Sequence, residues 1–359
     1  MKRILLVIEN LGSGGAERQL TGLAVMLKQH GYEVEVAYYI KKEFYLPFLL
    51  GNDVKVKFLS EAANPRTRLF AISRYIKSWN PDTIITYSES LGMIASLLKF
   101  LGLKYRLIVS ERNTTQQLNS REKIKFFFYR WADVIAPNSQ SQANFIAKHF
   151  PKLTKKVKVI TNFVDTEKFS PSQEPITKHD VLKMVCVGRL MPQKNIPRFI
   201  DAIGKVIKDG YKIQVDWYGQ DLEDGYSKEV HNEIIKSGIG DSFIFHQPSE
   251  KIQEEYRAAD VFCLPSLYEG FPNTLCEAMS CGKPVLCSRV CDNPNIVIEG
   301  ENGLMFDPLS VDDIAETIEK YIGLSDMLKY DMGRLSREIA LKMFSQESFI
   351  QKYINILKE

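Results

Sequence analysis

The chain has 359 residues, of which 45% are hydrophobic and 25% are charged. This composition is ordinary for a globular protein, and no run reaches the roughly 18 uncharged apolar residues that a membrane span needs. At about 100–200 residues per domain, the length predicts two domains.

The net charge of +3 is unevenly distributed along the chain. Residues 1–170 carry 26 Lys and Arg against 14 Asp and Glu, whereas the remainder carries 21 against 30. The basic half suggests an anionic partner, and anionic lipid, a phosphorylated acceptor and nucleic acid all fit. The alternative is surface charge that serves solubility alone.

The six cysteines all lie in the second half, and their spacings match no zinc or redox pattern. The five histidines are scattered, and no Asp-x-Asp pair is present to hold a divalent ion. We therefore expect no metal and no cofactor. Lys2 and Arg3 lead directly into a short apolar run, which is not typical of a signal peptide. We expect a cytoplasmic protein with reduced, buried thiols.

Strands alternate with helices along the first half. An apolar strand at 3–8 is followed by the glycine loop 11–15 and by a helix that ends near Gly31. Further strands are predicted at 34–38, 83–86, 107–109, 134–136 and 157–160. Alternation of this kind is typical of a parallel sheet covered by helices on both faces.

A polar, proline-containing stretch at 162–180 is predicted to link two such domains. Strands are predicted after it at 182–187, 213–218, 243–246, 261–264 and 285–287, with a helix at 197–208. The fold class is therefore α/β, with two Rossmann-like doubly wound domains. We assign 1–170 to the first domain and 171–342 to the second. In such folds ligands bind beyond the carboxyl ends of the strands, so a cleft between the two domains is the expected reaction site.

The strongest local motif runs from Glu269 to Glu277, after the strand at 261–264. Asn273 is a good helix N-cap and Gly282 a good helix stop, so a helix is predicted to start near Thr274. Free amides at Thr274 and Leu275 can hold a pyrophosphate. Glu277, one turn into the helix, can accept hydrogen bonds from ribose hydroxyls. The alternative is a glutamate that only complements the helix dipole.

A second motif, Gly188 to Lys194, follows the first strand of the second domain. Gly188 permits a turn, and Arg189 and Lys194 place two cations at the carboxyl end of that strand. Two fixed cations would neutralise a departing nucleoside diphosphate. The alternative is a solvated basic loop.

The glycine loop Gly12 to Arg18 does not complete the G-x-G-x-x-G pattern, because Glu17 stands where the last glycine belongs. This departure argues against a dinucleotide-dependent oxidoreductase. The backbone amides at Gly14 and Gly15 can still accept a phosphate, and a plain turn is the alternative.

Together, the glycine loop, the G-R-x4-K motif at 188–194 and the E-x7-E motif at 269–277 resemble the retaining GT-B glycosyltransferases of family 4. The resemblance implies that two domains face each other across a cleft and that the segment 343–359 crosses back to the first domain. It implies that Arg189 and Lys194 bind the donor diphosphate, Glu277 the ribose and Glu269 the donor sugar. Further donor contacts are implied at Gly270, Phe271, Asn273, Thr274, Leu275, Gly219 and His246.

Two departures from the family pattern stand out. The segment Ser110–Asn113 lacks the histidine that the family often carries near the reacting centre, and Arg112 is assigned to acceptor phosphate instead. Asn162-Phe163-Val164-Asp165 replaces the commoner Asn-Gly-Val-Asp, a change that we interpret as structural.

These features predict a glycosyltransferase that moves a hexose or N-acetylhexosamine from a nucleotide-sugar, with UDP-sugars favoured and GDP-mannose as the second choice. The acceptor is expected to be a glycan linked to polyprenyl pyrophosphate, in surface-polysaccharide assembly such as O-antigen, capsule or exopolysaccharide. The basic, aromatic segment 121–131 suits either a membrane interface or a core helix with a basic outer face, and the core helix is favoured. Peripheral contact of the first domain with the inner membrane is a further hypothesis.

The alternatives are a nucleotide-sugar epimerase of the same architecture and a non-enzymatic protein that binds anionic ligands. A nucleic-acid partner is not expected, because no recognition module is present.

Overall fold

The computed structural model describes residues 2–59, 65–112, 114–172 and 180–359. The chain divides into two compact units, Met1–Asn162 with Phe349–Glu359 (unit 1) and Phe163–Ser348 (unit 2). The chain therefore passes into unit 2 after Asn162, earlier than the predicted boundary at 170. Residues 173–179 of the predicted linker lie outside the described residues, as does Asn113.

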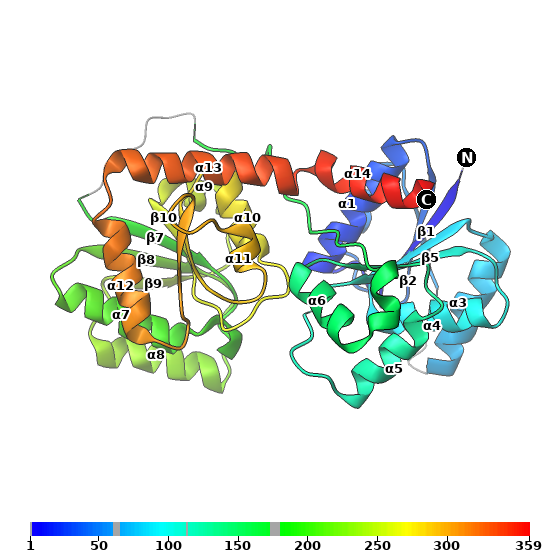
Figure 1. Ribbon diagram of the computed structural model, residues 1–359, viewed down its shortest axis with the longest axis horizontal. Helices are drawn as coiled ribbons and strands as arrows, with labels where there is room; N and C mark the ends of the chain where they lie inside the picture. The colour runs from blue at the N-terminus through cyan, green and yellow to red at the C-terminus, as the bar shows by residue number, and fades with distance from the viewer. Residues whose placement is uncertain (1, 60–64, 113, 173–179) are drawn as a thin grey trace. The chain divides into compact units, whose positions relative to one another are not determined.

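Unit 1 is built on a six-stranded parallel sheet in the order β3-β2-β1-β4-β5-β6 (Figure 1). Its strands are β1 (Arg3–Val7), β2 (Glu33–Tyr38), β3 (Lys55–Phe58), β4 (Thr83–Thr86), β5 (Arg106–Glu111) and β6 (Val134–Pro137). The strand order changes direction at β1, which pairs with both β2 and β4. Ligands of doubly wound sheets bind at such a switch point, beyond the carboxyl ends of the strands.

The first five helices of unit 1 lie between consecutive strands, and the sixth follows β6. They are α1 (Gly15–Gln29), α2 (Leu46–Gly51), α3 (Pro65–Trp79), α4 (Glu89–Phe100), α5 (Ser120–Tyr129) and α6 (Gln140–His149), with a short 3-10 helix at Pro151–Lys156. Ile72 of α3, Leu91 of α4 and Phe126 of α5 share one core with Leu5 and Leu107 of the sheet. These three helices therefore cover the same face.

The predicted strand at 157–160 is wrong. Val157 forms only an isolated bridge with Ile135, although the amides of Lys158 and Ile160 donate to the carbonyls of Ile135 and Pro137 in β6. The amide of Val157 itself bonds to the carbonyl of Thr154 in the preceding 3-10 helix, so the pairing does not extend into a ladder.

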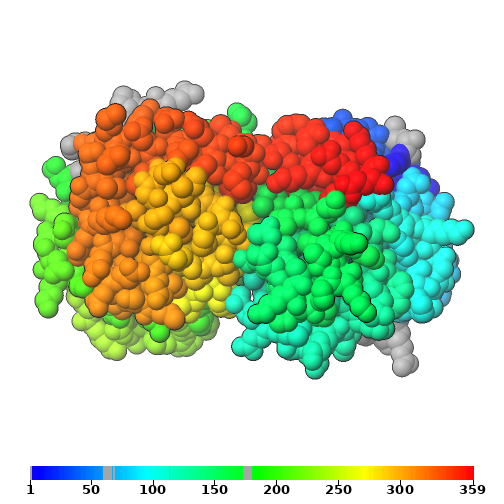
Figure 2. All heavy atoms as spheres, in the orientation of Figure 1, coloured from blue at the N-terminus to red at the C-terminus, as the bar shows by residue number. Residues whose placement is uncertain are grey.

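The last helix, α14 (Gln346–Lys358), lies on the surface of unit 1, where Figure 2 shows it in red. Phe349 and Tyr353 are buried, and Nζ of Lys2 donates to the carbonyl of Leu357 over 2.7 Å.

Unit 2 repeats the architecture with a parallel sheet in the order β12-β11-β10-β7-β8-β9 (Figure 1). Its strands are β7 (Leu182–Val187), β8 (Ile213–Tyr218), β9 (Phe243–His246), β10 (Val261–Leu264), β11 (Val285–Ser288) and β12 (Gly303–Phe306). Its helices are η2 (Pro192–Lys194, 3-10), α7 (Ile196–Lys208), α8 (Gly225–Ser237), α9 (Ile252–Ala258), α10 (Asn273–Ser280), α11 (Asn293–Ile296), α12 (Val311–Ile322) and α13 (Asp326–Phe344). Here the switch point lies at β7, between β10 and β8.

All six cysteines are free thiols, and all but Cys291 are buried, as the sequence predicts. Within the described ranges, no helix reaches the length and hydrophobicity that a bilayer span requires.

Candidate active site

The loops after β7 and β8 touch through their backbones at the switch point of unit 2. A Cβ at Gly219 would collide with the carbonyl oxygen of Gly188, so only glycine fits this approach. The same carbonyl accepts a hydrogen bond of 2.7 Å from Nε1 of Trp217. The two predicted glycines therefore form one packed edge beyond the carboxyl ends of the strands.

Lys194 and Glu269 form a buried ion pair at this edge. Nζ of Lys194 lies 2.7 Å from Oε1 of Glu269, and their side chains are 13% and 9% exposed. The lysine stem passes directly over Gly188, where a Cβ would lie 2.7 Å from Cε of Lys194. The structure thus brings together two residues that stand 75 positions apart and that the sequence placed in one site.

Gln193 joins the loops that carry this pair. Its carbonyl accepts the amide of Leu267 over 2.8 Å, and its side chain donates to the carbonyl of Tyr268 over 2.7 Å. Arg189 lies on the same loop after β7 with an exposed side chain. One cation is therefore fixed by its partner, and the other points to solvent.

Helix α10 begins one residue earlier than predicted. Pro272 is its N-cap and Asn273 its first helical residue, because the first helical hydrogen bond runs from the amide of Cys276 to the carbonyl of Pro272 over 3.1 Å. The N-cap role predicted for Asn273 is therefore wrong. The predicted stop is confirmed, since Gly282 has a φ of +74° directly after the helix. In the first turn, the amides of Thr274 and Leu275 have no intrahelical acceptor.

Glu277 lies in the second turn of α10 and is only 5% exposed. The hydroxyl of the buried Tyr256 lies 3.4 Å from its Oε2. Phe271 packs its ring against Phe344 at 5.6 Å, so only the backbone of the Gly270–Phe271 turn can serve a ligand.

Beyond β8 and β9, the ring of His246 stacks on that of Tyr218, with centroids 4.5 Å apart and planes 13° apart. Nε2 of His246 lies 2.7 Å from Oδ1 of Asp216, and the amide of Gly219 donates to the carbonyl of His246 over 3.0 Å. These contacts place His246 and Gly219 side by side at the carboxyl edge of the sheet.

Cys291 is a neighbour of this site that the sequence did not reveal. The backbone amide of Glu269 points at its Sγ over 3.4 Å, and Cys291 has a φ of +50°. A left-handed cysteine carries no signal in the residue pattern, because glycine and asparagine are the residues expected in that conformation.

The glycine loop of unit 1 leads into α1, whose N-cap is Gly14. A Cβ at Gly14 would collide with Oε2 of Glu17, so that carboxylate lies over the first turn of α1. There it complements the helix dipole. Glu9, at the end of β1, accepts hydrogen bonds of 2.9 Å from the hydroxyls of Ser88 and Ser90.

Arg112, assigned to acceptor phosphate, follows β5. Its Nη1 donates to Oδ1 of Asn162 over 2.8 Å and its Nη2 to the hydroxyl of Tyr353 over 2.9 Å. Its guanidinium carbon lies 4.0 Å from the ring centroid of Tyr87. In this arrangement Arg112 holds α14 and the end of the chain segment that leaves unit 1.

Glu111, one residue earlier, is the centre of a buried network. Nζ of Lys125 lies 2.7 Å from its Oε2, and the hydroxyl of Tyr129 donates to its Oε1 over 2.8 Å. Burial raises the pKa of the Glu111 carboxyl, and Lys125 offsets part of that effect. The network sits under the Ser110–Arg112 segment and was not predicted, because nothing in the sequence links Glu111 to Lys125.

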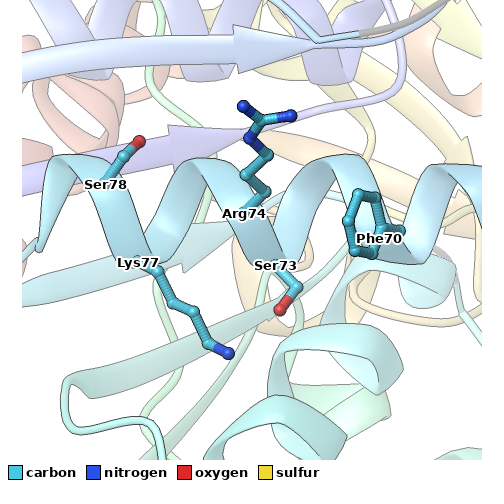
Figure 3. Close-up of a pocket in the computed structure, with 5 residues that line it drawn as sticks. All are labelled: Phe70, Ser73, Arg74, Lys77 and Ser78. Atoms are coloured by element: carbon cyan, nitrogen blue, oxygen red, sulfur yellow. The ribbon is translucent and has the colours of Figure 1, made fainter.

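A shallow surface cavity lies elsewhere, on α3, where Figure 3 shows Phe70, Ser73, Arg74, Lys77 and Ser78 along the helix. It contains none of the predicted site residues. Across the part of the chain that the structure describes, no cluster of His, Cys, Asp and Glu side chains is arranged to hold a metal ion.

Both halves of the chain match family models of glycosyltransferases. Residues 13–168 match the family model Glycosyltransferase Family 4, and residues 168–332 match Glycosyl transferases group 1. The amylovoran biosynthesis glycosyltransferase AmsD of Erwinia amylovora is 26% identical over 365 residues, covering 99% of this chain and 100% of that protein. A Campylobacter jejuni α-1,4-N-acetyl-D-galactosaminyltransferase, named for a diphospho-undecaprenol-linked glycan acceptor, is 27% identical over 297 residues, covering 78% of this chain and 77% of that protein.

Among solved structures, Anabaena HepE in complex with UDP superposes with a TM-score of 0.87 at 20% identity, over 100% of both chains. That likeness shows the fold, and the family models show the activity. The chain is therefore a glycosyltransferase with the GT-B fold.

Proposed function

We propose that the protein is a retaining glycosyltransferase that moves a hexose or N-acetylhexosamine from a UDP-sugar to a lipid-linked glycan during cell-surface polysaccharide assembly. GDP-mannose is the second candidate donor. The relatives support this proposal, since one is named for amylovoran biosynthesis and another for an undecaprenol-linked acceptor. The HepE structure contains UDP, which supports the choice of base.

The buried Lys194–Glu269 pair is the observation that carries the proposal. When the sugar–phosphate bond breaks, negative charge collects on the departing diphosphate. A lysine held in place by its carboxylate partner needs little reorganisation to stabilise that charge. Arg189 supplies a second cation from the same loop, and Glu269 lies beside the position of the sugar.

The rest of the donor fits around this pair. The first-turn amides at Thr274 and Leu275 can bind the phosphates, since the N-terminus of a helix attracts anions. Glu277, one turn further, can accept hydrogen bonds from both ribose hydroxyls. His246 and Gly219 line the edge where the base would lie. We propose that these cations and amides serve without a divalent ion.

Glu277→Ala tests the donor site. Two hydrogen bonds to a carboxylate are worth about 1.5–3 kcal/mol each, so UDP affinity and kcat/KM should fall by at least about a hundredfold. Calorimetric titration with UDP measures the first quantity, and mass spectrometry of products across UDP- and GDP-sugars measures the second. Glu254→Ala, on the exposed face of α9, is the matched control. Wild-type turnover in Glu277→Ala would overturn the site.

The absence of a metal requirement has its own test. Activity should survive exhaustive treatment with EDTA. Loss of activity that Mg²⁺ or Mn²⁺ restores would contradict a metal-independent mechanism while leaving the donor residues in place.

A further inference from the structure

Among the described residues of unit 1, two clusters of exposed large apolar side chains are accompanied by cations. The first, the α2 patch, consists of Lys41, Lys42, Phe44, Phe48 and Leu50. The second, the α5 patch, consists of Phe100, Leu101, Ile124, Phe127 and Arg130. Single exposed apolar residues are common on proteins, but clusters mark contact surfaces.

The α2 patch is built by a short helix that buries little of its apolar content. Leu49 is fully buried and anchors α2, whereas Phe44, Phe48 and Leu50 are 67%, 45% and 56% exposed. The ring of Tyr45 connects the two phenylalanines, with centroids 5.0 Å from Phe44 and 6.5 Å from Phe48. The aromatic side chains therefore form one continuous ridge.

Two exposed lysines flank this ridge, and its acidic neighbour is engaged. Lys41 and Lys42 are exposed, whereas Glu43 accepts a hydrogen bond from the hydroxyl of Tyr38. Aromatic rings beside cations are the composition that binds anionic lipid headgroups while inserting below them. An exposed ridge of this kind suits a flat lipid surface better than it suits a small ligand.

The first residues of the α2 patch also lie at the carboxyl edge of the sheet. Lys41, Lys42 and Phe44 follow the carboxyl end of β2, and their segment is tied to the glycine loop after β1. The amide of Leu11 donates to the carbonyl of Lys42 over 2.7 Å, and the amide of Tyr45 donates to the carbonyl of Leu11 over 2.9 Å. Ligands of this sheet are expected at that edge.

The α5 patch lies at the opposite edge. Ring centroids of Phe100 and Trp131 are 4.6 Å apart, and Arg130 lies over the ring of Phe127 at 4.1 Å. These residues come at the ends of α4 and α5, directly before β5 and β6 begin, so they lie at the amino ends of the strands. The favoured core-helix interpretation of segment 121–131 therefore describes only its buried side, because Ile124 and Phe127 are exposed.

We propose that the α2 patch is the surface through which the protein contacts an anionic membrane. This contact would direct the carboxyl edge of unit 1 toward an acceptor whose lipid end stays in the bilayer. The lipid-linked acceptor in this inference rests on the proposed function. The membrane contact itself does not, because it requires no sugar transfer.

Vesicle flotation tests the proposal. The full-length protein is incubated with vesicles of phosphatidylcholine alone or mixed with phosphatidylglycerol. Phe44→Ser combined with Phe48→Ser should lower partition into the mixed vesicles by at least about tenfold, since two largely exposed aromatic rings lose their apolar contact. Lys41→Ser combined with Lys42→Ser should lower it by about fivefold per lysine, with no change on phosphatidylcholine.

Ile124→Ser combined with Phe127→Ser, in the α5 patch, is the matched control and should partition as the wild type does. Loss of flotation in this control, or wild-type flotation in the phenylalanine variant, would overturn the proposal. So would a wild-type protein that ignores phosphatidylglycerol. A wild-type dimer that the phenylalanine variant dissociates would instead assign the patch to a second copy of this chain.

Turnover on a water-soluble acceptor separates this inference from the proposed function. The phenylalanine variant should keep wild-type turnover there, because Phe44 and Phe48 are not among the residues assigned to the donor or to the acceptor. Absence of transfer by the wild type with every donor would count against the proposed function alone.

Discussion

The carboxyl edges of the two sheets are built on the same topology but occupied differently. In unit 2, a backbone contact between Gly188 and Gly219 and the buried Lys194–Glu269 pair form a site from residues of several loops. In unit 1, the polar residues at the equivalent edge are already bonded to their own unit, as Arg112 is to Asn162 and Tyr353. Under the proposed function, the nucleotide site of unit 2 is fixed in advance, whereas the described residues at the edge of unit 1 form no comparable preassembled site.

The largest effect that separates these edges is expected at the ion pair. Glu269→Ala should lower kcat by about a hundredfold, on the scale of losing one preorganised electrostatic group, and should change UDP affinity far less. Lys194→Ala should weaken UDP binding as well, because in the proposed site its charge stabilises the diphosphate. Steady-state kinetics and calorimetric titration with UDP measure both.

Either single variant leaves a buried charge without its partner, which typically costs about 3–5 kcal/mol of unfolding free energy. Thermal denaturation therefore accompanies the kinetics, and Glu269→Gln, which keeps the shape of the side chain, is the control. Equal losses of UDP affinity in Glu269→Ala and Lys194→Ala would contradict the separate roles proposed for them.

The next largest effect is expected from substitution of Arg112. Its result distinguishes a structural role of this residue from a role in binding the acceptor. If its contacts are structural, Arg112→Ala should lower the unfolding free energy by about 2–4 kcal/mol, because hydrogen bonds to a charged donor are lost. Arg112→Lys should not restore it, since an ammonium cannot donate to Asn162 and Tyr353 as a fork does. Urea denaturation measures this.

If Arg112 instead binds the acceptor phosphate, the opposite result is expected. Arg112→Ala would then raise the KM for a phosphorylated acceptor, while the unfolding free energy would stay near that of the wild type. Measuring both quantities on the same variant distinguishes the two roles.

The strands of the two units differ in how well their positions could be predicted from the sequence. The strand Ile213–Tyr218 alternates buried apolar residues with partly exposed ones and ends at Gly219, so its position could be predicted to the residue. β3 was missed because Lys55 and Lys57 give this edge strand a polar pattern.

The contacts of the candidate site also differ in how far the sequence could predict them. The glycines and charged residues of unit 2 stand at motif spacing, so it could be anticipated that Lys194 and Glu269 meet at one sheet edge, whereas their ion pair is seen only in the structure. The pairing of Glu111 with Lys125 joins a strand end to a helix, and only the folded chain brings them together. The contact of Cys291 with Glu269 depends on the left-handed backbone conformation of Cys291, which could not be predicted from a cysteine.

The smallest effect is expected from two glycines of unit 2 that differ only in their surroundings. Gly219→Ala should lower the unfolding free energy by about 2 kcal/mol, because the new methyl group meets the carbonyl of Gly188 and the loops must separate. Gly204→Ala, inside α7 with open space around it, should raise it by about 1 kcal/mol through helix propensity. Urea denaturation of both variants gives the contrast, and UDP affinity should fall only in Gly219→Ala. Equal stabilities would mean that the loops after β7 and β8 adjust freely, and the donor edge would then be no more fixed in advance than the acceptor edge.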